Sequence, residues 1–513
     1  MAARRILNGI LSGGGLTAAS AVSSLVLLRL VFQHLPAELV GVWLLFITLG
    51  GYSLLLDLGT GPTLAREISF ALGDPALTPQ ERQRRLADIG ATCLAIFLVL
   101  MLLVLVLAAG VGLWFIPTLV TADQRAMVGT AWAIFSAGAA LNLFGGAAFS
   151  ILFGMGDVAV ERGCRMASLL VGFTLSAGLL LAGQGLVGLS IGWLVQGVIA
   201  RVIAVLYIRR RHAGLFSGGR PSATLMRRIA GPSLRWATTS LGGVLILQTG
   251  TLMVSMRIGT AAVGPYEAVS KMLNLLMTLA LLIVTSSSPF LSRAHAGGDA
   301  KAFKSLLFAS VKYAVAVMAV AGALLAFYIE PVIGLWLGKS VFAGHAVAWT
   351  LLAMLILEVH HVALATGSMA TGRRFFVTAA LLAGAINLAL AYFLAPHLGL
   401  WGVALAVFLA QILTNNWYVP YVTLGDLGVS WRRYAREVAG PLLLLLAACL
   451  GASAALRHAT AHWSDAASLL LAVALLPPFG VVMTFVLVCT AEERRHVAQR
   501  LLPGRRRTPE VHP

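Results

Sequence analysis

Long runs of apolar residues, separated by short polar segments, dominate the chain from end to end. A run of about 20 apolar residues is long enough to cross the roughly 30 Å hydrocarbon core of a bilayer as a helix. Alternation with a period of two is missing, which excludes a membrane β-barrel. The pattern therefore predicts an all-α, polytopic membrane protein of about 14 transmembrane helices, at 11–33, 39–58, 88–116, 128–153, 166–183, 186–208, 236–256, 263–288, 305–329, 345–366, 375–395, 399–419, 438–456 and 466–490.

A glycine-and-arginine motif occurs twice along the chain. The first copy runs from Val-Gly-Val-Trp at 40–43, through an apolar run, to Pro-Thr-Leu-Ala-Arg at 62–66. The second copy runs from Val-Gly-Pro-Tyr at 263–266, through another apolar run, to Pro-Phe-Leu-Ser-Arg at 289–293. Transporters are often built from such internal repeats, with the substrate site between the copies.

The repeat predicts how the chain is divided. Six helices return the chain to the side of the membrane on which it started, so the two copies have the same orientation and form a parallel pseudo-repeat. The last two helices lie outside it. We therefore expect an N-lobe of six helices at 1–208, a cytoplasmic linker at 209–235, a C-lobe of six helices at 236–419, two extra helices at 420–490 and a basic cytoplasmic tail at 491–513.

Basic residues are distributed very unevenly across the membrane. With the N-terminus inside, the cytoplasmic segments hold 29 lysines and arginines and the opposite side holds 5. By the positive-inside rule, both termini face the cytoplasm. This asymmetry accounts for the net charge of +18 without a nucleic-acid partner. The basic tail either lies on anionic membrane lipid or acts only as a topology anchor.

Ionisable side chains inside apolar runs are costly, so each is a candidate for function. Glu267, Lys271 and Asn274 follow a spacing of i, i+4, i+7, which places them on one helix face. Glu267 and Lys271 are close enough along the helix to form an ion pair. The stripe either faces a central substrate cavity or is a structural pair near the outer surface.

Three arginines are candidates for contact with an anionic substrate. Arg29 and Arg257 end corresponding helices of the two copies, near the outer face. Arginine binds phosphate oxygens in a bidentate manner, so this pair has the chemistry to hold a pyrophosphate. Arg201 lies one to two turns inside a helix and has the charge to attract an anionic headgroup. For all three, snorkelling to the lipid headgroups is the alternative interpretation.

Gating and coupling have their own candidates. Asp57 ends the second predicted helix and either pairs with Arg66 to close an inner gate or is a plain interfacial acid. Arg293 is the repeat equivalent of Arg66. Glu358 and His361 share a helix face at a spacing of i, i+3, which is compatible with proton coupling or with structural polar packing. No further ligand accompanies them, so a metal site is not expected.

Three stretches resemble the polysaccharide and O-antigen flippases of the multidrug/oligosaccharidyl-lipid/polysaccharide exporter superfamily. They are residues 35–43 (Leu-Pro-Ala-Glu-Leu-Val-Gly-Val-Trp), residues 56–68, with Leu-Asp-Leu-Gly and Leu-Ala-Arg-Glu-Ile, and residues 263–271 (Val-Gly-Pro-Tyr-Glu-Ala-Val-Ser-Lys). The similarity covers the first twelve helices. The two extra helices depart from the commonest twelve-helix form and leave kinship with the fourteen-helix lipid II flippases open.

The resemblance implies a function. Similar family members move undecaprenyl-pyrophosphate-linked oligosaccharides to the outer leaflet of the bacterial inner membrane by alternating access between two lobes. It implies a lipid-linked oligosaccharide, membrane lipids and other polysaccharide-assembly membrane proteins as partners, and no cofactor beyond coupling to a proton or sodium gradient. A cation-coupled multidrug antiporter and a membrane glycosyltransferase or ligase are the alternatives. The first predicted helix lacks an acid, and no outward loop exceeds about 18 residues, so both are disfavoured and an enzyme is not expected.

Overall fold

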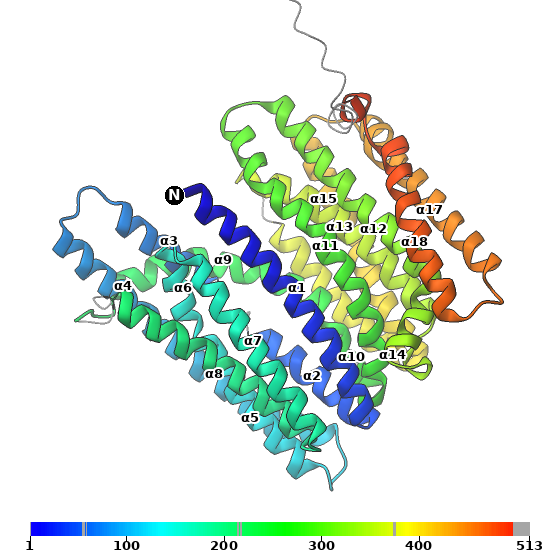
Figure 1. The fold of residues 1–513 in the computed structure, drawn as a ribbon. Helices are drawn as coiled ribbons and strands as arrows, with labels where there is room; N and C mark the ends of the chain where they lie inside the picture. The colour runs from blue at the N-terminus through cyan, green and yellow to red at the C-terminus, as the bar shows by residue number, and fades with distance from the viewer. Residues whose placement is uncertain are drawn as a thin grey trace, which may run out of the picture. The chain divides into compact units, whose positions relative to one another are not determined.

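The computed structural model describes residues 2–53, 57, 59–212, 215, 218–372 and 376–495. Every regular element within these ranges is a helix (Figure 1). Most of the residues predicted as a basic tail, 496–513, lie outside the described ranges. The all-helical prediction is therefore confirmed for the part of the chain that the structure describes.

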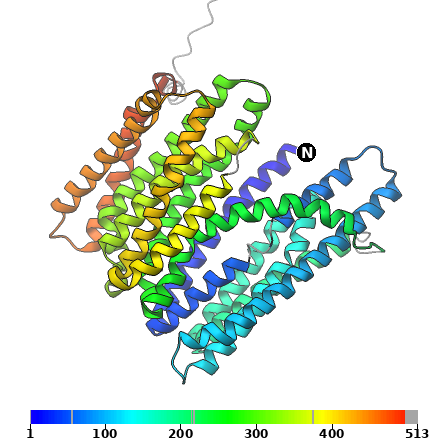
Figure 2. The same ribbon diagram turned by 180° about the vertical axis from the view of Figure 1, so that it is seen from behind.

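The chain forms two compact units, and each is described separately. Unit 1 comprises Met1–Glu267 and Ala380–Ala406. It contains the first residues of α11, most of α14, and ten complete helices: α1 (Ala2–His34), α2 (Ala37–Ser53), α3 (Thr60–Gly73), α4 (Pro79–Gly110), α5 (Arg125–Phe144), α6 (Gly146–Gly154), α7 (Val158–Leu181), α8 (Gly185–Arg211), α9 (Ala223–Leu247) and α10 (Thr249–Arg257). Helices α5, α7 and α8 pack side by side, and α1 lies along α7 (Figures 1 and 2).

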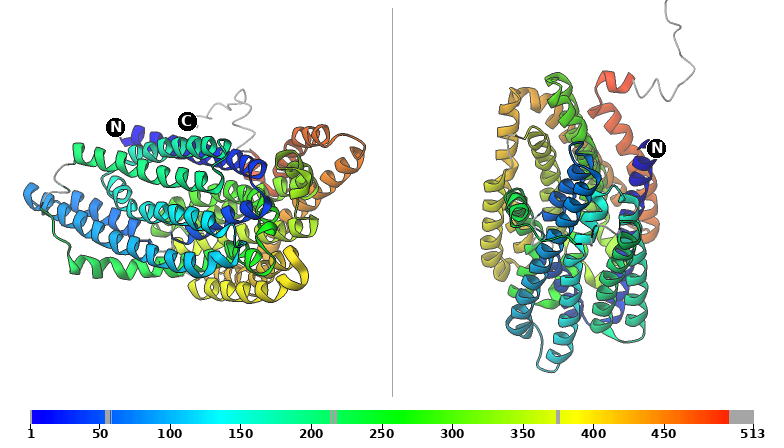
Figure 3. Two further views of the ribbon diagram at one scale, coloured as in Figure 1. Left: turned by 90° about the horizontal axis from the view of Figure 1, so that it is seen from below. Right: turned by 90° about the vertical axis from the view of Figure 1, so that its left-hand side faces the viewer.

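Unit 2 comprises Ala268–Ala379 and Val407–Pro513. It holds most of α11 (Val263–Ala296), both ends of α14 (Val377–Leu413), α12 (Ala300–Trp336), α13 (His345–Ala370), α15 (Asn415–Asp426), the short α16 (Trp431–Tyr434), α17 (Gly440–Ala459) and α18 (Asp465–Met483). Helix α12 is central to this unit, because α13, α17 and α18 all pack against it (Figures 1 and 3).

Eleven helical segments are long and apolar enough to cross a membrane, by length and composition, in the described residues. The apolar α2 is shorter, at 17 residues. One of the eleven, Val377–Asp426, has 50 residues and contains Gly399 with non-helical φ of 58° and ψ of −142°. A straight helix of 50 residues would be about 75 Å long, more than twice the bilayer core, so this segment accommodates two of the predicted spans. The total of fourteen stays a prediction.

Two predicted loops contain helix. Helix α3 occupies part of the segment between the second and third predicted spans, and it follows Gly59, whose φ of 66° turns the chain. The predicted linker 209–235 is shorter in the structure, because α8 continues to Arg211 and α9 begins at Ala223, capped by Ser222. The first element of the second repeat therefore starts about a dozen residues earlier than hydropathy indicates.

The core of unit 1 is built on aromatic rings. Phe135 of α5 is fully buried and contacts the rings of Trp43, Phe46, Trp132 and Trp193 at centroid distances of 5.3 to 6.0 Å. Rings in such arrangements contribute stabilisation beyond their buried area. The cluster joins α2, α5 and α8 and gives the unit a rigid centre.

Each of the two motif glycines lies close to the segment around the other one, inside unit 1. A Cβ placed on Gly41 would lie 1.8 Å from the carbonyl oxygen of Thr260, four residues before Gly264. A Cβ on Gly264 would lie 3.0 Å from the ring of Phe32 and 3.6 Å from Val40. The repeated segments therefore pack against each other with their backbones in near contact, which only glycine permits at position 41.

Candidate functional site

A broken helix lies in unit 1 within one of the predicted spans. Helix α9 ends before Gln248 and α10 begins after it, so backbone carbonyls are released from helical bonding. The Asn387 side-chain amide donates to the carbonyls of Leu245 at 3.0 Å and Ile246 at 3.3 Å, and the Tyr52 hydroxyl donates to that of Gln248 at 3.2 Å. Irregular backbone at membrane depth survives only when it is satisfied in this way.

Glu267 faces this break. The Thr251 hydroxyl of α10 donates to the Glu267 carboxylate, and both side chains belong to unit 1. Among the ion pairs of the described residues, none joins Glu267 to Lys271, so the pairing that the sequence suggested is replaced by a hydroxyl contact. Two turns after Glu267, the Asn274 amide donates to the backbone carbonyl of Ser270 at 2.8 Å. Lys271 is half-buried.

Arg29 and Arg257, the arginines predicted near the outer face, are both exposed, and neither is in an ion pair of the described residues. The Arg257 guanidinium lies 4.1 Å from the centre of the Tyr392 ring, a cation–π contact. Arg29 lies on the exposed side of α1, one residue after the buried Leu28. Both arginines keep free donors for phosphate oxygens, so substrate binding and snorkelling stay open as interpretations.

The Arg201 guanidinium is hydrogen-bonded to backbone carbonyls. One guanidinium nitrogen donates to the Asn142 carbonyl at 2.7 Å and another to the Gly197 carbonyl at 3.0 Å, while the Phe149 ring lies 5.1 Å away. Asn142 stands near the end of α5, where the chain breaks before α6. Since these contacts occupy two of its nitrogens, Arg201 supports a helix break in this conformation.

Asp57 and Arg66 do not form the predicted gate pair in the described residues. The Asp57 carboxylate accepts from the Thr60 hydroxyl at 2.6 Å and the Gly61 backbone N–H at 3.3 Å, which stabilises the start of α3. Arg66 is 4.0 Å from the carboxylate of Glu67, and Arg228 of α9 is 3.5 Å from it. Glu67 is only 2% exposed, so this buried acid is the centre of the charge cluster.

Unit 2 contains a second broken helix with a buried polar network. Helix α14 ends before Thr414 and α15 begins after it. The Gln411 amide donates to the Glu358 carboxylate, and the Asn415 amide donates to the Gln411 side-chain oxygen at 2.8 Å. His361 lies 3.8 Å from the same carboxylate. The His361 ring also contacts the Asn416 side-chain oxygen at 3.0 Å.

This network combines a carboxylate, an imidazole and two amides, and proton coupling and structural polar packing both stay open as interpretations. Glu358, His361, Gln411 and Asn415 are all at most 7% exposed. The carboxylate is hydrogen-bonded but has no lysine or arginine partner among the described ion pairs, so one added proton would neutralise it. The structure thus brings Glu358 and His361 together, as their spacing indicated. No group of three or more histidine, cysteine or acidic side chains suited to a metal occurs in the described ranges.

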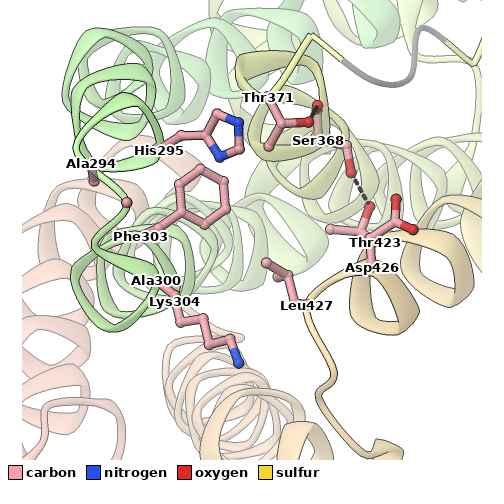
Figure 4. Close-up of a pocket in the computed structure, with 11 residues that line it drawn as sticks. Ala294, His295, Ala300, Phe303, Lys304, Ser368, Thr371, Thr423, Asp426 and Leu427 are labelled. Carbon is pink, nitrogen blue, oxygen red and sulfur yellow. Dashed lines mark hydrogen bonds between the residues drawn. The ribbon is translucent and has the colours of Figure 1, made fainter.

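A small pocket of about 300 Å³ lies in unit 2 where α11, α12, α13 and α15 begin or end (Figure 4). The His295 and Phe303 rings meet edge to face at 6.0 Å, and the Ser368 and Thr423 hydroxyls are hydrogen-bonded at 2.8 Å. Lys304 and Asp426 add charge to the wall. Arg293 is exposed on the same last turn of α11 as His295 but does not line the pocket.

The sequence indicated the acids but not the hydroxyl partners Tyr52 and Thr251. Spacing along one helix identified Glu267, Glu358 and His361, whereas Tyr52 and Thr251 come from other helices and carry no local signal. Gln411 and Asn415 are spaced i, i+4, and that spacing was available as a sign of a polar helix face. Glu67 stands inside the Leu-Ala-Arg-Glu-Ile stretch, but the sequence patterns gave it no role.

Long apolar helices, two of them broken at hydrogen-bonded polar clusters, define a multi-pass membrane protein. The fold matches the lipid II flippase MurJ in an inward closed conformation with a TM-score of 0.68 at 15% identity, over 96% of this chain and 100% of that one. It also matches an inward-facing multidrug resistance MATE family transporter of the MOP superfamily, with a TM-score of 0.62 at 15% identity, over 80% of this chain and 95% of that one. The chain therefore shares its fold with these two solved structures.

Residues 13–295, more than half of the chain, match the family described as polysaccharide biosynthesis protein, and the chain belongs to that family. The uncharacterized membrane protein EpsK of Bacillus subtilis (strain 168) is 27% identical over 281 residues, which are 52% of this chain and 53% of EpsK. That match spans about half the length of either protein. The predicted family, the polytopic fold and the assignment as a non-enzyme agree with these comparisons.

Proposed function

We propose that the protein moves a lipid-linked oligosaccharide from the inner to the outer leaflet of the bacterial inner membrane, by alternating access. The family supports a role in polysaccharide biosynthesis, and the fold supports a flippase or transporter. A sugar headgroup with an anionic pyrophosphate cannot cross hydrocarbon alone, whereas the prenyl tail can stay in lipid. A transporter of this class carries only the headgroup through protein.

The coverage of the fold comparisons favours the flippase over the drug antiporter. The flippase MurJ aligns with 96% of the 513 residues and the MATE transporter with 80%, a difference of about 82 residues. The C-terminal segment predicted at 420–490 is of similar length, 71 residues. The extra helical pair of this chain therefore has a counterpart in the flippase fold.

Lys271, Asn274, Arg29 and Arg257 are the residues that we assign to the headgroup in this proposal. Arg29 and Arg257 are exposed and keep donors for phosphate, and Lys271 is a half-buried cation without an acidic partner among the described ion pairs. Arg201 and Asp57 have structural contacts in this conformation, so we assign them no role in binding. The proposal also places both termini in the cytoplasm, as the charge asymmetry indicates.

Reconstitution tests the proposal directly. The purified chain is placed in liposomes that contain a fluorescent undecaprenyl-pyrophosphate oligosaccharide, and a membrane-impermeant quencher reports the leaflet of the headgroup. Protein-dependent movement of the headgroup, and no movement of a fluorescent phosphatidylglycerol, is the expected result. Export of a cationic dye by the same liposomes without sugar-lipid movement would instead identify a drug antiporter.

A further inference from the structure

An apolar cavity of about 550 Å³ lies inside unit 1, between α2, α4, α5 and α9. The rings of Trp132 and Phe135 line part of the cavity, and small residues such as Ala139 and Ala237 line other parts. No charged side chain is among its described lining residues. It is therefore chemically distinct from the polar cluster at the α9–α10 break.

The cavity wall is mainly apolar, and part of its rim is exposed. Its polar atoms are mostly satisfied within the wall, since the Trp132 indole N–H donates to the Ala108 carbonyl at 2.9 Å and the Ser53 hydroxyl to the Gly50 carbonyl at 2.6 Å. Apolar cavities do not retain water. On the rim, Leu107 is 52% exposed and Leu234 is 62% exposed. A flexible hydrocarbon chain is the occupant that such a surface accepts.

Positive charge lies at one end of the cavity, along α9. Helix α9 is continuous from Ala223 to Leu247, and Arg227 precedes the rim residue Leu234 by seven residues, which puts both on one face about 10 Å apart. Next to it, Arg228 shares the buried carboxylate of Glu67 with Arg66. The three arginines exceed the single acid by two charges, so this end attracts an anionic headgroup.

We propose that this cavity is a subsite for the prenyl chain of the lipid-linked substrate, with the arginine cluster on α9 and α3 as the first contact for its phosphate. The inference rests on the proposed function and names where the substrate tail is held. The combination of a dry apolar cavity and a cationic end complements an anionic prenyl lipid. No acidic side chain is among the described lining residues, so the cavity offers no counter-charge to a cationic drug.

The test uses the full-length chain and undecaprenyl phosphate as the probe, with binding measured by native mass spectrometry. Ala139→Phe fills the cavity from α5, and Ala237→Phe fills it from α9. Ala133→Phe is the matched control, because Ala133 lies on the exposed side of the same helix. We expect both cavity variants to lose at least tenfold in affinity for undecaprenyl phosphate, with the control and the binding of phosphatidylglycerol unchanged.

Two outcomes would overturn the subsite. One is normal prenyl-lipid binding by both cavity variants; the other is an equal loss of phosphatidylglycerol, which would show an ordinary acyl-chain site. If either variant misfolds, a photo-crosslinking residue in place of the exposed Leu241 gives the same information without filling the cavity. A crosslink to phosphatidylglycerol but not to the prenyl lipid would refute the proposal.

A substitution at Ser136 distinguishes a hydrocarbon occupant of the cavity from a polar one. Its hydroxyl is buried in the cavity wall and has no hydrogen-bond partner. Ser136→Ala is expected to leave prenyl-lipid binding unchanged, and a loss would point to a polar ligand and against a tail.

Transport of a substrate with a short tail distinguishes failure of the subsite from failure of the proposed function. Ala139→Phe should move a substrate with a two-isoprene tail as fast as the wild type and the undecaprenyl substrate at least tenfold more slowly. Equal rates with both tails would reject the subsite, whereas no movement of either substrate by the wild type would reject the function itself.

Discussion

Single polar side chains at membrane depth are costly, and the structure shows how this chain stabilises them. The Glu267 carboxylate accepts a hydrogen bond from the Thr251 hydroxyl, and the Glu358 carboxylate accepts one from the Gln411 amide. Neither acid is neutralised by a lysine or arginine in the described ion pairs. Neutral hydrogen-bond donors thus stabilise both acids where a buried ion pair would otherwise be expected.

Lys271 is the residue on which the cationic-site proposal depends most. Lys271→Ala should slow headgroup movement roughly ten- to a hundredfold, because one charge-assisted contact contributes about 1.5–3 kcal/mol. Lys271→Arg should keep part of the rate, since the charge is retained. Initial flipping rates in liposomes measure both.

Lys301→Ala provides the control for Lys271, because Lys301 is an exposed cation in the first turn of α12. Its rate should equal that of the wild type. A Lys271→Ala protein with a normal rate and a normal amount in the membrane would remove this residue from the mechanism.

Glu358 is the residue that we expect to link transport to a proton gradient. Glu358→Gln keeps the shape of the side chain and an oxygen for the Gln411 amide, but it cannot be protonated and deprotonated. It should abolish acceleration by an imposed pH gradient while exchange at equal pH continues. The comparison of rates with and without the gradient measures this.

Glu330→Gln is the matched control for coupling, because Glu330 is half-exposed and contacts only His345 at 3.1 Å in the described bonds. It should retain the response to the gradient. Should Glu358→Gln respond to the gradient as the wild type does, the network would be structural polar packing.

At the scale of helices, hydropathy located most elements, because burial in lipid requires apolar runs whatever the tertiary fold. It could not locate the breaks. Gln248 and Thr414 interrupt apolar runs without a proline at the break. At Gln248, the freed carbonyls are satisfied by Asn387 and Tyr52, which are far away in sequence. Helix α3 was missed because its amphipathic sequence is too polar for a span.

Glycine at position 41 sets how closely α2 approaches the start of the second repeat. Gly41→Ala should lower the melting temperature by several degrees, because the added Cβ lies 1.8 Å from a backbone oxygen that cannot move aside alone. Gly178→Ala in α7 is the control, since nothing lies within 4 Å of its added Cβ, and it should be neutral or stabilising. Thermal unfolding in detergent measures both, and equal melting temperatures would show that the helices adjust freely.

At the scale of the whole molecule, the charge asymmetry predicts one topology. Reporter fusions in the α8–α9 connection, after Gly219, and at the C-terminus after Arg507 should both be cytoplasmic, whereas a fusion after His462 should be periplasmic. A fusion after Arg235, the end of the predicted linker, is unsuitable because Arg235 lies inside α9. A periplasmic signal at Gly219 or Arg507 would contradict the fourteen-helix arrangement.

Lys312, buried in the first half of α12, connects the fold to the order in which the chain is synthesised. It is 4% exposed, and its ammonium group donates to the Val488 carbonyl at 3.2 Å and to the Glu493 carboxylate at 3.3 Å, just beyond α18. Its partners therefore leave the ribosome about 180 residues after it. Until then the lysine is an unmatched charge in a nascent membrane domain, which costs about 2.5–3.5 kcal/mol if it inserts. A chain that stops before Val488 leaves the buried ammonium group without either of these partners.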